Sequence, residues 1–104
     1  MTLDRWLDER STAVPPRLTA RLAESLSAHR DAKTDQASDV CVDAADALLR
    51  DLLVRGSAGR DVALDLLTVD ALATYAFEAA ADDPGALRQR AAAAAARFAA
   101  AVND

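Results

Sequence analysis

Residues 60–81 restrict the fold more than any other segment of the chain. Plotted on a helical wheel, their apolar side chains form two stripes on opposite sides of one helix. The first stripe contains Val62, Leu66, Val69, Ala73, Ala76 and Phe77, and the second contains Leu64, Leu67, Ala71 and Tyr75. Because each stripe needs a partner that removes it from water, we expect this helix to occupy the centre of a bundle.

The composition favours an all-α fold. Alanine and leucine, two of the strongest helix formers, account for 27 and 14 of the 104 residues, whereas isoleucine is absent and only four residues are aromatic. An apolar fraction of 52% is too high for a disordered chain. The length of 104 residues suits one domain with a buried core. We therefore predict a single helical domain over residues 1–104: a compact bundle of four main helices plus a short N-terminal helix.

Proline, glycine and capping residues divide the chain into the predicted helices. A short N-terminal helix and a Pro-Pro break occupy residues 1–15, and a second helix runs to about residue 29. Residues 30–38 contain no apolar side chain larger than alanine and are expected to form an exposed polar loop. Ser38 or Asp39 is expected to cap the third helix, and the fourth and fifth begin near residues 60 and 84.

Polar residues lie between the two stripes of the central helix. Asp65 and Thr68 occupy one side, and the other side carries Asp70, Thr74 and Glu78 at a spacing of four. Two carboxylates in this line, if enclosed in a bundle, could bind a cation or share a proton. The alternative is that the line reaches solvent or pairs with arginines of a neighbouring helix. We favour pairing, and expect Arg90 and Arg97 of the fifth helix to supply it. These two arginines together with Asp70, Thr74 and Glu78 are our candidate ligand site.

The other chemically active residues are predicted to have structural roles. A second polar line, in the third helix, contains Asp39, Asp43, Asp46 and Arg50. Its aspartates have a spacing that can hold Mg²⁺, but a solvated face with an Asp46–Arg50 pair is the interpretation we favour. His29 is the only histidine, which excludes a histidine cluster within one chain, and Cys41 falls on an apolar stripe. We therefore predict no catalytic residue, metal or cofactor.

The charge distribution argues against nucleic-acid and membrane partners. The net charge is −5, and residues 31–83 carry twelve acidic and four basic residues, which repel a phosphate backbone. A DNA-recognition helix presents Arg, Lys, Asn or Gln, whereas the central helix presents Asp and Leu. No uncharged apolar run approaches the roughly 18 residues of a membrane span. The N-terminus lacks the apolar stretch of a secretion signal, so we expect a cytoplasmic protein.

A core built mainly of alanine and leucine predicts association with another chain. Alanine buries little surface, so a domain of this size has limited stability as a monomer. The N-terminal helix also carries Leu3, Trp6 and Leu7, which are candidates for contact with a partner. For Trp6 we favour a role as a cover on the chain's own core. The predicted function is a non-enzymatic protein-interaction or regulatory module that binds itself or another protein, most simply as a homodimer. The alternative is a small-ligand or metal-binding bundle, with or without enzymatic activity, that uses the acidic line inside the bundle.

Overall fold

The computed structural model describes residues 2–10, 14–29, 31–55, 60–81 and 83–103. Within these ranges the chain forms helices and no strand, which confirms the predicted all-α bundle. The helices are α1 (Leu3–Arg10), α2 (Pro16–Ser25), α3 (Ala37–Arg55), α4 (Arg60–Ala80) and α5 (Pro84–Asn103), with short 3₁₀ turns at Ser27–His29 and Thr34–Gln36. None of the helices in the described ranges combines the length and apolarity needed to cross a membrane.

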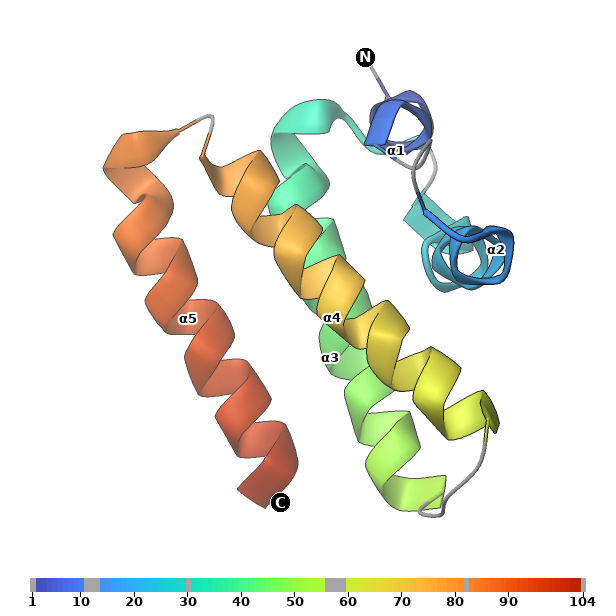
Figure 1. Ribbon diagram of the computed structural model, residues 1–104. Helices are drawn as coiled ribbons and strands as arrows, with labels where there is room; N and C mark the ends of the chain where they lie inside the picture. Colours follow the sequence, from blue (N-terminus) through green and yellow to red (C-terminus); the bar gives the residue numbers. More distant parts are fainter. Residues whose placement is uncertain (1, 11–13, 30, 56–59, 82, 104) are drawn as a thin grey trace.

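The centre of the bundle is an antiparallel hairpin of α3 and α4 (Figure 1). α1 and α2 cover one side of this hairpin, and α5 lies on the other. α4 contacts α2, α3 and α5, as expected for the central helix, and α3 shares the central position because it contacts both α4 and α5. α3 and α5 run parallel, since ion pairs join Asp39 to Arg90 near their starts and Asp43 to Arg97 farther along.

The buried side of α4 differs from the one that the wheel predicts. The polar side with Asp65 and Thr68 faces the core, together with Leu72 and Ala76. The two apolar stripes flank this buried side, so several of their large members, including Leu66, remain exposed. Burial of the polar side is possible because arginines of α2 and α3 neutralise Asp65, and the Thr68 hydroxyl donates to the Leu64 carbonyl at 2.8 Å.

The apolar side of α1 is part of the core. Leu3, Trp6 and Leu7 are all buried, and the Trp6 indole meets the Tyr75 ring of α4 edge to face at 6.0 Å between ring centroids. The role that we favoured for Trp6, as a cover on the chain's own core, is the one found in the structure. The three residues named as candidate partner contacts are therefore enclosed within the fold.

The segment expected to be an exposed loop at 30–38 contains, among its described residues, a 3₁₀ turn at Thr34–Gln36 and the buried start of α3. α3 already begins at Ala37, and both Ala37 and Ser38 are buried. The Ser38 hydroxyl does not act as the predicted cap; it donates to the backbone carbonyl of Ala76 in α4 at 2.8 Å. Small side chains at this point allow the start of α3 to approach the end of α4 closely. The hydrogen bond then satisfies a hydroxyl that is buried there.

Candidate functional site

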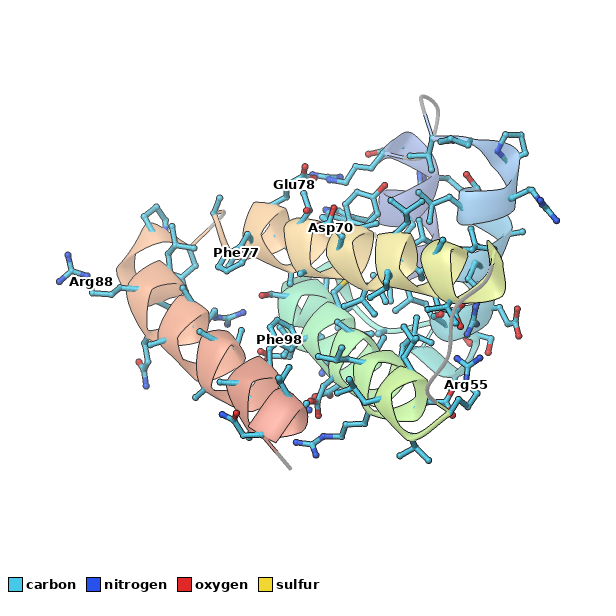
Figure 2. All side chains as sticks on the ribbon, turned by 60° about the horizontal axis from the view of Figure 1, so that its bottom comes forward. Arg55, Asp70, Phe77, Glu78, Arg88 and Phe98 are labelled. Carbon is cyan, nitrogen blue, oxygen red and sulfur yellow. The ribbon has the colours of Figure 1, made fainter. Side chains whose placement is uncertain are left out.

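The predicted acidic line lies on the solvent side of α4 (Figure 2). Asp70, Thr74 and Glu78 are all exposed, and the Thr74 hydroxyl donates to the Asp70 carbonyl of its own helix at 2.9 Å. The Glu78 carboxylate accepts a hydrogen bond from Nε of Arg10 at 3.3 Å. The partner is therefore an arginine, as expected, but it comes from α1 and not from α5.

Arg10 makes two further contacts that fix its position. Its guanidinium carbon lies 3.8 Å from the centroid of a Trp6 ring, and Nη1 donates to the Trp6 carbonyl at 3.4 Å. The Arg10 guanidinium therefore lies over the Trp6 indole and contacts Glu78 from that position. Because both charged groups are partly exposed, this ion pair fastens α1 to α4 only weakly.

Arg90 and Arg97 point to α3 and so do not join the acidic line. Arg97 donates through Nη1 to Asp43 at 2.6 Å and through Nη2 to Asp46 at 3.0 Å, while Arg90 lies 3.9 Å from Asp39. The hydrogen bonds to Asp43 and Asp46 raise the pKa of Arg97 above its ordinary value. The five residues of the candidate ligand site are thus divided between two separate surfaces, because α5 lies along α3 with its arginine flank toward that helix.

The aspartates of α3 form ion pairs with arginines. Asp46 is buried and accepts from Arg97 and from Nε of Arg50, the predicted partner one helical turn away, at 3.2 Å. Among the described residues, no group of three or more His, Cys, Asp or Glu side chains is arranged to hold a metal ion. The spacing that suits Mg²⁺ in the sequence is used here for contact between α3 and α5.

Asp65 is a buried carboxylate at the centre of a charge cluster that was not predicted from the sequence. Its two carboxylate oxygens accept from Nε of Arg21 in α2 and Nη2 of Arg55 in α3, each at 2.7 Å. Desolvation of the carboxylate raises its pKa, but the hydrogen bonds and charges of Arg21 and Arg55 outweigh it, so the pKa of Asp65 lies below its ordinary value of 3.8. One carboxylate therefore joins three helices. Part of this cluster was predictable from the sequence, because the short connection between α3 and α4 places Arg55 near Asp65.

Cys41 is a core residue, as predicted. Its side chain is fully buried between the central helices, and burial raises the pKa of the thiol to about 12. The thiol stays protonated near neutral pH and is not a nucleophile in the folded protein.

An apolar surface lies where α3 and α5 end. We call it the end patch, and it consists of Leu53, Val54, Ala101 and Val102, which line a shallow groove together with Arg50. Val54 and Val102 are 87% and 63% exposed. The exposure of Val54 was predictable from the sequence, because this valine lies four residues after Arg50 and eleven after Asp43, on the polar line of the helix.

Comparisons of the chain with protein family models, curated proteins and solved structures find no match.

Proposed function

We propose that this protein is a non-enzymatic interaction module that forms a homodimer through the end patch. The observation that carries the proposal is the exposure of Val54 and Val102, 87% and 63%, at adjacent ends of two helices. Complete burial of a valine or leucine side chain contributes about 1.5–3 kcal/mol. A two-fold axis through the patch would bring Leu53, Val54 and Val102 of both copies into one contact. Each of these side chains would then be buried in both copies and contribute twice to the stability of the dimer.

The charges around the end patch support a second copy as the partner. Arg50, on the edge of the groove, is paired with Asp46 of its own chain. Arg55, at the end of α3, is paired with Asp51 and Asp65. Two identical patches can therefore approach without bringing these two arginines together as unneutralised cations, which would oppose association.

The alternative function, a small-ligand or metal site in the acidic line, has less support. Asp70, Thr74 and Glu78 lie on an exposed helix face, and Glu78 is paired with Arg10. A binding pocket requires polar groups that converge within a concave site. The two arginines expected to complete this site are instead engaged by α3.

Sedimentation velocity across the micromolar range tests the proposal. We expect the wild-type chain to shift from monomer to dimer as the concentration rises, and Val54→Glu to remain monomeric because the dimer would bury a carboxylate. Leu67→Glu is the matched control: Leu67 is a half-exposed side chain on α4, outside the end patch. This variant should dimerise like the wild type, and far-UV circular dichroism should show that both variants fold.

Two results would overturn the proposal. The first is a wild-type chain that stays monomeric at high micromolar concentration. The second is a Leu67→Glu variant that loses association to the same extent as Val54→Glu, because the contact would then not be specific to the end patch.

A further inference from the structure

Half of the end patch lies on a helix that is attached to the bundle by few apolar contacts. Among the described residues of α5, only Ala94 and Ala101 are buried, while Leu87 and Phe98 are partly buried. An alanine side chain is a single methyl group, so these two residues contribute little to the attachment. α3 and α4, in contrast, bury large side chains such as Leu48, Leu52 and Leu72.

The end patch also lies at the far end of α5 from its connection to the hairpin. α4 ends at Ala80 and α5 begins at Pro84, and the two helices diverge from this turn (Figures 1 and 2). Val102 is about 27 Å from Pro84 along the helix, at 1.5 Å per residue. A rotation of α5 by about 10° at the turn therefore moves Val102 by about 5 Å. Such a movement separates the α5 half of the end patch from the α3 half.

A network of charged groups fixes α5 next to α3 close to the end patch. Arg97, five residues before Val102, binds Asp43 at 2.6 Å and Asp46 at 3.0 Å. Asp46 in turn binds Arg50 at 3.2 Å, and Arg50 lines the end patch. The chain of contacts therefore runs from α5 through Arg97 and Asp46 to the edge of the surface that we propose for dimerisation.

We propose that docking of α5 on α3 and dimerisation through the end patch are thermodynamically coupled, with Arg97 as the positioning residue. This inference rests on the proposed homodimer. The second copy binds the chain whose α5 is docked, because only then do Val54 and Val102 form one surface. By linkage, dimerisation stabilises the docked position of α5 by the same factor by which docking strengthens the dimer.

Substitution of Arg97 is the first test, because this residue is outside the end patch. We expect Arg97→Ala to raise the dimer dissociation constant about fivefold, the range that a partly exposed ion-pair network supports. Arg97→Lys keeps one cation near the two aspartates and should retain most of the affinity. Arg88→Ala is the matched control on the same helix, since Arg88 is exposed and points away from the bundle (Figure 2). It should dimerise like the wild type.

Hydrogen exchange gives a readout that a purely structural role of Arg97 would not change. At concentrations where the wild type is monomeric, we expect amides around Ala94 and Phe98 to exchange faster than that of Leu72 in α4, and their protection to rise with protein concentration. One set of results would refute the coupling but not the homodimer. In that case the wild type dimerises, Arg97→Ala dimerises as tightly as Arg88→Ala, and hydrogen exchange in α5 does not depend on protein concentration. A wild type that never dimerises overturns both proposals.

Mixing two weakened variants tests whether α5 docks within its own chain. Arg97→Glu and Asp43→Arg each place like charges at the α3–α5 contact, so each variant alone should dimerise weakly. If α5 docks in its own chain, their mixture should remain weak, because every chain keeps one defective contact. Recovery of wild-type affinity on mixing would show that α5 docks on the other copy, which overturns the coupling as proposed.

Discussion

Asp65→Asn should destabilise the fold more than any other replacement of a charged side chain by one of the same shape. The Asp65 side chain is 7% exposed and accepts hydrogen bonds from two guanidinium groups, both at 2.7 Å. A hydrogen bond to a charged group contributes about 1.5–3 kcal/mol, and the partly exposed arginines recover some of this from water when the carboxylate is lost. We therefore expect a loss of about 2–3 kcal/mol, out of a total near 5–15 kcal/mol for a domain of this size.

Urea unfolding followed by far-UV circular dichroism measures this loss, and thermal unfolding should show a Tm lower by about 10–20 °C. Asp51→Asn is the matched control, because Asp51 binds the same Arg55 but is 58% exposed. It should cost less than about 0.5 kcal/mol. If Asp65→Asn also stays within about 0.5 kcal/mol of the wild type, the cluster does not hold the three helices together and our interpretation fails.

The same cluster predicts a dependence of stability on pH. The pKa of Asp65 is lower in the folded protein than its ordinary value of 3.8, so its contribution is complete above that value. It is lost as the pH falls from there through the lower, folded-state pKa. The stability difference between the wild type and Asp65→Asn should therefore shrink on acidification, whereas it should be constant between pH values near 5 and 7.

Three further predictions, two on substitutions and one on a chemical reaction, follow from the contacts described above. Ser38→Ala removes the buried hydrogen bond to the Ala76 carbonyl, and it should lower the unfolding free energy by about 1 kcal/mol in urea titrations. Glu78→Gln weakens only an exposed pair with Arg10, so the same titration should show a change below about 0.5 kcal/mol; a larger loss would mean that the acidic line has a structural role we have not assigned. Cys41 should react with a thiol reagent only at the rate of unfolding, because its pKa is about 12 and its side chain is buried; rapid modification of the native protein at neutral pH would contradict this burial.

Local sequence patterns were sufficient to predict the helices but not the sides on which they pack. Alanine and leucine content together with Pro16 and Pro84 located the four main helices and the short one. The wheel placed Asp65 between the two apolar stripes but did not show that this side is buried, because a single helix gives no information about charges on other helices. Its counter-ion Arg21 is 44 residues away in the sequence, and only the packing of α2 brings it near.

The arginines expected at the candidate ligand site lie elsewhere for a related reason. The prediction that arginine neutralises the acidic line was correct in residue type, since Arg10 binds Glu78. The choice of helix was wrong because it depended on the direction in which α5 faces. In the sequence, both α3 and α4 carry a line of acidic residues with which Arg90 and Arg97 could pair, and nothing in the spacing of the arginines decides between them. The line on α3 with Asp43 and Asp46 is the one they contact.

The placement of Trp6 has a practical consequence for spectroscopy. This residue is the only tryptophan of the chain, and it lies at the junction of α1 and α4, with Tyr75 at its edge and the Arg10 guanidinium over a ring. Its emission should report whether the N-terminal helix is seated, whereas α5 lies on the opposite side of the hairpin from α1 (Figure 1). Fluorescence and circular dichroism recorded on one sample therefore separate undocking of the N-terminal helix from loss of helix elsewhere.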